Sequence, residues 1–340
     1  MTQRSEATYA MHGGDGATRP HGFWPTLVAD MAPQDWLTLA YFGGLVVSIA
    51  FGIGPGILHS LLFAGELIVA FLFGMALTRG GIIPRGTFLH GLVYRLAAFI
   101  PTFVSYFELR TILPACTRRA VDSTLYAIDI KVFGVEPALA WDRFVSPHTV
   151  EWFSFFYFGY FFLLALHILP FLFAARDMAM LARFAAATLL VFFVGHTLYV
   201  LVPGFGPYRA LADQFHHPLH GGVFWPMVRA TVEDAGAQKD IFPSIHTAIP
   251  VTFTALAFRY RKRFRPYAFS WPIVGFCASQ IIIATMFLRW HYLIDIVAGL
   301  ALAAFAVFAA ERMVRWDELR RERLGLPYAW PPLWGCRRPR

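Results

Sequence analysis

Two short stretches of the chain, DIFPSIH and RWHYLID, hold the side chains best suited to chemistry. The second carries His291 and Asp295, which share one face of a helix because they are four residues apart. A carboxylate in that position can bind one imidazole nitrogen and leave the other as a nucleophile. The same spacing also occurs in purely structural pairs, so HxxxD alone does not establish catalysis.

The first stretch has the pattern of a helix start. Pro243 and Ser244 precede an apolar run, and a serine at this position favours an N-cap. Free backbone N–H groups and the helix dipole favour an anion there, so Ser244 is a candidate phosphate ligand. His246, one turn inside, is a candidate general acid. The plainer alternatives are a simple cap and an interfacial histidine.

Arginines lie near both stretches. Arg209, in GPYRA, and Arg289, directly before WH, carry guanidinium groups that can bind phosphate oxygens with two hydrogen bonds. Either could instead anchor lipid headgroups. Two histidines, a carboxylate, an anion site and these cations together describe phosphoryl transfer that needs no metal and no other cofactor.

The HHPLH run at 216–220 lacks the carboxylates or cysteines that usually complete a metal site, and we interpret it as a solvated loop. The three cysteines are far apart, which indicates neither a disulfide framework nor a zinc site.

The composition predicts the elements that must position these residues. Hydrophobic residues make up 57% of the chain and charged residues only 15%, whereas a soluble domain carries about 25% charged residues. Several apolar runs reach the roughly 20 residues that a bilayer crossing needs, which excludes a soluble enzyme. We therefore expect an all-α, polytopic membrane bundle. The net charge of +8 does not call for a nucleic-acid partner, because membrane proteins hold basic residues on one side.

The apolar runs predict eight spans, at 36–54, 57–78, 88–106, 152–175, 181–202, 246–260, 270–288 and 291–311. The expected organisation has four parts: a disordered cytoplasmic tail (1–35), N-terminal helices with an interfacial segment at 107–150 (36–150 in all), a catalytic core (151–311) and a basic cytoplasmic tail (312–340).

The distribution of lysine and arginine predicts the orientation. With the N-terminus in the cytoplasm, 19 of the 29 basic residues fall on the cytoplasmic side and eight on the other. Both chemistry-bearing stretches then lie on the extracytoplasmic face of a bacterial inner membrane or its equivalent. A polar headgroup can reach them there while its lipid tail stays in the bilayer.

PSIH followed, after one helical hairpin, by HYLID resembles the type-2 phosphatidic acid phosphatase superfamily, over roughly residues 180–311. The resemblance implies that His291 is a nucleophile forming a phosphohistidine, that Asp295 is its partner and that His246 is the acid on the leaving group. It also implies that Ser244 binds phosphate.

The sequence departs from the commonest pattern of that superfamily. Ala284 and Thr285 stand where the pattern has Ser-Arg, and only GFGPYR stands near its KxxxxxxRP motif. The stretches DIFPSIH, ATMFLRWHYLIDIVAG and LYAIDIKVFGVEPAL look similar to bacterial proteins of the branch that contains fungal inositol phosphorylceramide synthase.

Three functions follow as hypotheses. In the first, a phosphotransferase moves a phosphoryl headgroup from a phospholipid donor to a lipid hydroxyl; in the branch it resembles, these are phosphatidylinositol and ceramide. In the second, water replaces the lipid acceptor, and a phosphatase acts on phosphatidate, a polyprenyl (di)phosphate or a related lipid. The third is a non-catalytic transporter or scaffold, against which the intact motifs argue. The sequence carries no signal for an oligomeric state.

Overall fold

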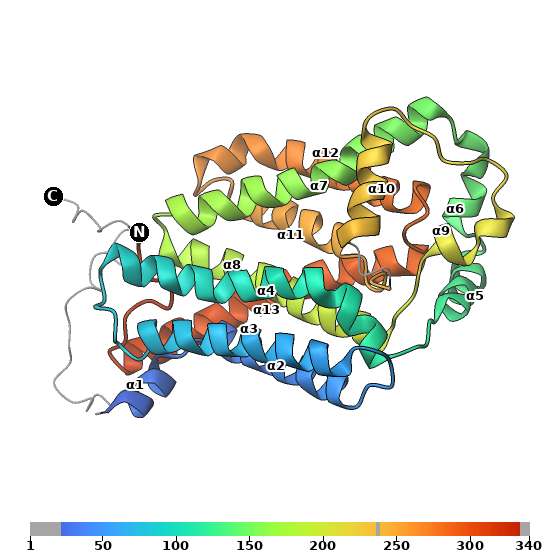
Figure 1. Cartoon of the computed structure of the whole chain (residues 1–340). Coiled ribbons are helices and arrows are strands. Elements are labelled where there is room, and N and C mark those ends of the chain that lie inside the picture. Colours follow the sequence, from blue (N-terminus) through green and yellow to red (C-terminus); the bar gives the residue numbers. More distant parts are fainter. Residues whose placement is uncertain (1–21, 236–238, 334–340) are drawn as a thin grey trace.

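The structure, a computed structural model, describes residues 22–235 and 239–333, and this part of the chain is helical without any strand (Figure 1). This confirms the all-α prediction. The helices are α1 (Phe23–Asp30), α2 (Pro33–Ala50), α3 (Ile57–Thr78), α4 (Phe88–Cys116), α5 (Asp122–Phe133), α6 (Pro137–Ala140), η1 (Asp142–Phe144), α7 (Pro147–Ala174), α8 (Met178–Leu201), α9 (Pro207–Ala210), η2 (Ala212–Gln214), α10 (Phe224–Ala235), α11 (Ile245–Tyr260), α12 (Arg265–Phe287) and α13 (Leu293–Arg323).

Within the described residues, six helices are long and apolar enough to cross a membrane: α3, α4, α7, α8, α12 and α13. The other two predicted spans fall on α2 and α11, of 18 and 16 residues. Neither helix is both long enough and apolar enough to cross a membrane. Helix α2 begins with polar residues, and α11 is too short. Six apolar helices of this length make the chain an integral membrane protein.

Helix α8 lies at the centre of the bundle, where most of its residues are buried. It packs against α2, α4, α11 and α13. Three successive alanines, 185–187, and Gly195 have little or no side chain, so neighbouring backbones approach closely. A Cβ on Gly195 would lie 2.5 Å from the Ile245 side chain, at the start of α11.

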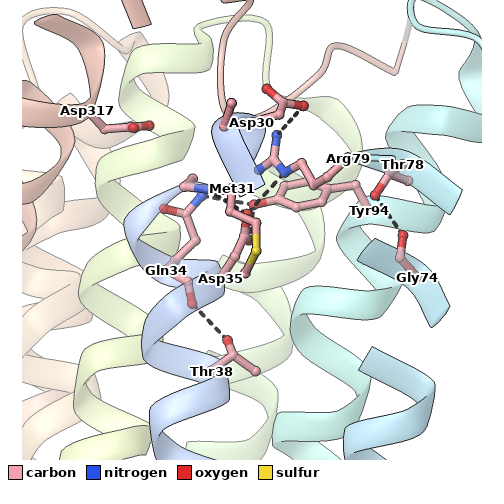
Figure 2. A network of polar contacts seen from close by, with 12 residues as sticks. Asp30, Met31, Gln34, Asp35, Thr38, Gly74, Thr78, Arg79, Tyr94 and Asp317 are labelled. Atoms are coloured by element: carbon pink, nitrogen blue, oxygen red, sulfur yellow. Dashed lines mark hydrogen bonds and ion pairs between the residues drawn. The ribbon is translucent and has the colours of Figure 1, made fainter. Parts of the chain in front are cut away.

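Part of the predicted N-terminal tail is ordered. Helix α1 and the start of α2 fall within 1–35, while residues 1–21 lie outside the described part. Figure 2 shows the reason: Arg79 reaches between Asp30 and Asp35, with N–O distances of 3.7 and 3.0 Å. Tyr94 of α4 donates to Asp35 at 2.8 Å. The charges are buried, so they stay paired, and the pairing fastens this segment to the bundle.

The first part of the predicted C-terminal tail is also helical. Helix α13 continues to Arg323 because Arg321 pairs with Asp317 at 2.7 Å and with Asp30 at 2.9 Å. This network holds the N-terminal helices to the helix that carries Asp295, at the end of the bundle far from that carboxylate (Figure 1).

The polar connections gather at the other end. Helix α4 extends beyond the predicted span to Cys116, and the rest of 107–150 contains α5, α6, η1 and the first turn of α7. The long connection 203–245 contributes α9, η2 and α10 at the same end (Figure 1). The arginine-bearing turns between α3 and α4, α7 and α8, and α11 and α12 lie at the opposite end, with α1.

Candidate active site

A cavity of about 740 Å³ is lined in part by α9 and α10, which lie at the same end of the bundle as α5 (Figure 1). Aromatic side chains of α4 and α7 form much of its wall, and both His246 and His291 line it. Phe107 and Phe162, which also line it, are 51% and 61% exposed on the outer faces of their helices. The cavity therefore reaches from the two histidines to the apolar outer surface of the bundle.

His291 and Asp295 occupy the junction between α12 and α13, and both are buried. Asp295 Oδ2 accepts a hydrogen bond from Tyr292 N at 2.9 Å and lies 3.4 Å from His291 Nδ1. The carboxylate, fixed by the first turn of the helix, thus engages Nδ1 and leaves Nε2 as the nitrogen for other chemistry.

Burial lowers the pKa of His291 to about 4, against the opposing effects of the Asp240 charge and a main-chain hydrogen bond to Ile241. The imidazole is therefore neutral at pH 7, and a neutral imidazole has the lone pair that attack on phosphorus requires.

His246 faces His291 across the cavity, with 6.3 Å between the ring centroids. Its ring lies against Tyr157, stacked at 4.6 Å, and Tyr160, at 4.3 Å. His246 Nε2 has no hydrogen-bond partner among the described residues. A buried polar atom of this kind is normally paired, so the nitrogen is available to a substrate oxygen.

Ser244 is buried at the N-cap of α11, where its hydroxyl accepts from Thr247 N at 3.3 Å and from Thr247 Oγ1 at 3.2 Å. Its own N–H donates to Asp295 O at 3.0 Å. Gly299 permits this close approach, since a Cβ there would lie 2.6 Å from the Ser244 carbonyl oxygen. Ser244 therefore caps the helix, as the plainer alternative states, and does not line the cavity. Its binding of phosphate stays a prediction.

The two candidate arginines have different surroundings. Arg209, on α9, is exposed, lines the cavity and lies over the Phe205 ring at 4.2 Å. Arg289 does not line the cavity: it pairs with Asp142 at 2.8 Å and packs over Phe215 at 3.8 Å. A buried arginine is held by its carboxylate partner, so we interpret Arg289 as a residue that holds the loop before His291. Its binding of phosphate stays a prediction.

Helix α5 supports the site from outside through two aspartates on one face. Asp122 accepts from the backbone N–H groups of Phe205, at 3.0 Å, and Gly206, at 2.9 Å, next to Arg209. Asp129 accepts from the N–H groups of Leu293, at 2.6 Å, and Ile294, at 2.9 Å. One helix thus positions both the loop before the arginine and the first turn of α13.

Sequence analysis missed Asp129, although it lies in the LYAIDIKVFGVEPAL stretch. It also missed Asp240, which begins the DIFPSIH stretch and lines the cavity. Tyr157 and Tyr160 gave no signal, because aromatic residues are common throughout α7.

We expect Asp129→Asn to lower kcat about 10- to 100-fold with little change in KM, since removing one N–H acceptor displaces the turn before Asp295 and small displacements of reacting groups are costly. Steady-state kinetics in detergent measure both constants. Lys131→Gln, an exposed change on the same helix, is the control. A proportional rise in KM, or an unchanged kcat in a folded variant, would argue against the positioning role.

Comparison with known proteins gives one match. The family model described as the PAP2 superfamily matches residues 123–309, more than half of the chain. This range contains the site residues described above, except Asp122 and the cavity-wall residues of α4, such as Phe107. Neither the curated proteins nor the solved structures include a match.

Proposed function

The chain belongs to the PAP2 superfamily, whose members are lipid phosphatases and phosphotransferases, and we propose that this one is a phosphotransferase. It moves a phosphoryl headgroup from a phospholipid donor to a lipid hydroxyl through a phosphohistidine on His291. This is the reaction type of inositol phosphorylceramide synthase, the branch that the motifs resemble. Hydrolysis of a lipid phosphate, with water as the acceptor, is the second candidate.

The observation that carries the proposal is the pairing of His246 and His291, 6.3 Å apart, in one largely aromatic cavity that reaches the outer face of the bundle. The headgroup phosphate binds between the rings while the lipid chains leave past Phe107 and Phe162 into the bilayer. An apolar surround excludes water and strengthens electrostatic interactions at phosphorus.

In the first step His291 Nε2 attacks phosphorus, an N–P bond forms and the bond from phosphorus to the leaving oxygen breaks. Protonated His246 gives its proton to that oxygen; the bound phosphate anion favours the protonated ring. Asp295 stabilises the positive charge that appears on His291, and Arg209 offsets negative charge on the phosphoryl oxygens.

In the second step the acceptor hydroxyl gives its proton to His246 and its oxygen attacks phosphorus. The N–P bond breaks, which returns both histidines to their starting states. Water in place of the hydroxyl gives the phosphatase reaction with the same residues. The apolar wall near the histidines favours the lipid acceptor over water, because it accommodates a second hydrocarbon chain.

We also propose that the site faces away from the cytoplasm. The arginine-bearing segments 79–85, 176–183 and 259–265 lie at the end of the bundle opposite α9 and α10 (Figure 1), two helices that line the cavity. Excess basic residues are retained in the cytoplasm. Cysteine labelling of Lys131→Cys and Arg261→Cys from the two sides of sealed vesicles distinguishes the two orientations.

The test of the function uses purified protein in detergent and a phospholipid labelled with ³²P, with and without ceramide or diacylglycerol. A transferase moves label to a new lipid only when the acceptor is present. Release of inorganic phosphate regardless of the acceptor would establish the phosphatase. Absence of turnover across a panel of donors would contradict both and support the non-catalytic alternative.

A further inference from the structure

The charge on the cavity wall is unusual for a site that binds anions. Among the described residues that line it, Arg209 is a cation and Glu233 and Asp240 are carboxylates. Glu233 is 58% exposed and pairs with Arg229 at 2.6 Å, so its charge is offset at the surface. Apart from this surface pair, the described charged residues that line the cavity are one cation, Arg209, and one carboxylate, Asp240.

Asp240 has no ion-pair partner in the part of the chain that the structure describes. It is half-buried, and its hydrogen bond from a neighbouring side chain is donated by Tyr106 OH at 3.4 Å. The adjacent Lys239 does not offset it, since Lys239 Nζ donates to the carbonyl oxygen of Thr117, 3.3 Å away, and lies over the Phe205 ring.

Asp240 also lies close to the nucleophile. It and His291 line the same cavity, and the charge on each alters the pKa of the other. Burial raises the pKa of Asp240. Binding an anion beside it either brings like charges together or makes the carboxyl take up a proton, and both cost free energy.

That cost rises with the charge on the phosphate. A phosphomonoester carries roughly −1.5 to −2 at pH 7, whereas a phosphodiester has lost the second ionisable oxygen and carries a single negative charge. Charge repulsion in a partly buried site is screened much less than in water. Because Arg209 is already set against Asp240, each negative charge on the phosphate is repelled, and the monoester carries the larger charge.

We propose that Asp240 is a specificity residue, which makes this site select phosphodiester lipids, with one negative charge on the phosphate, over phosphomonoester lipids. The inference rests on the proposed function and goes further, since it names the class of donor lipid and the one carboxylate that selects it. It also accounts for a cavity lined by one arginine where the chain departs from the commonest superfamily motifs.

The test compares phosphatidylmethanol with phosphatidate of the same acyl chains, because a single methyl group removes the second charge. Release of diacylglycerol in mixed micelles at pH 8 reports kcat/KM for each lipid. We expect the wild type to favour the diester at least about tenfold, and Asp240→Asn to reduce that ratio about tenfold or more. Asp240→Glu keeps the charge and should keep the preference.

Asp213→Asn is the matched control, since Asp213 is exposed on η2 and does not line the cavity; its ratio should equal that of the wild type. An Asp240→Asn ratio equal to the wild-type ratio, or a wild type that favours phosphatidate, would overturn the proposal.

Binding of inorganic phosphate gives a readout that does not depend on turnover. In a His291→Ala background, calorimetry should show phosphate binding at least about tenfold tighter when Asp240 is also changed to Asn. Equal phosphate affinities with and without Asp240→Asn would reject the specificity role, although neither variant is catalytically active. Failure to label wild-type His291 would reject the proposed function alone, because this binding comparison needs no nucleophile.

Discussion

His291→Ala is expected to lower kcat by roughly 10⁴- to 10⁶-fold, the range seen when the nucleophile of a covalent mechanism is removed. Without the imidazole no N–P bond can form, and Asp295 and His246 have no intermediate to stabilise. The change removes a side chain at the cavity wall, so we expect the protein to insert and fold. Turnover of a ³²P-labelled phospholipid measures the loss.

Trapping the intermediate adds a second readout. Rapid quenching of the wild type should leave ³²P on the protein in a form that is stable to base and lost in acid, as an N–P bond is, and His291→Ala should carry none. His220→Ala, an exposed histidine outside the cavity, should label and turn over like the wild type. Labelled protein or wild-type turnover in the His291 variant would refute the assignment of the nucleophile.

His246→Ala is expected to show an effect that depends on the leaving group. For a natural lipid the departing alkoxide needs a proton, and loss of the general acid should slow the first step about 10²- to 10⁴-fold. A nitrophenyl ester of the same phosphate releases a stable anion, so its first step should slow much less, by less than about tenfold.

The second step also needs His246 as a base, which predicts a burst. With the nitrophenyl substrate the variant should release about one equivalent of nitrophenolate per active site and then turn over slowly, while phosphohistidine accumulates. His148→Ala, an exposed change near the start of α7, should show no burst. Equal slowing of the first step for both leaving groups would remove His246 from the acid role.

The sequence by itself determined the fold class and the family. Apolar runs long enough to cross a bilayer leave few alternatives to a helical membrane bundle, and the helices fall where those runs predict. The stretches around His246 and His291 carried the superfamily resemblance, because PSIH and HYLID are each short and continuous in the sequence. The helix start at Ser244 also follows from residue type, because serine favours the N-cap position.

Only the tertiary structure decided which charges line the cavity. Arg209 and Arg289 look equivalent in sequence, yet one lines the cavity and the other pairs with Asp142, 147 residues away. Asp240 and Asp129 likewise depend on the tertiary structure, which places Asp240 in one cavity with His291 and Asp129 against the first turn of α13. Buried polar groups are specified by their partners in space, and the residue types along the chain do not name those partners.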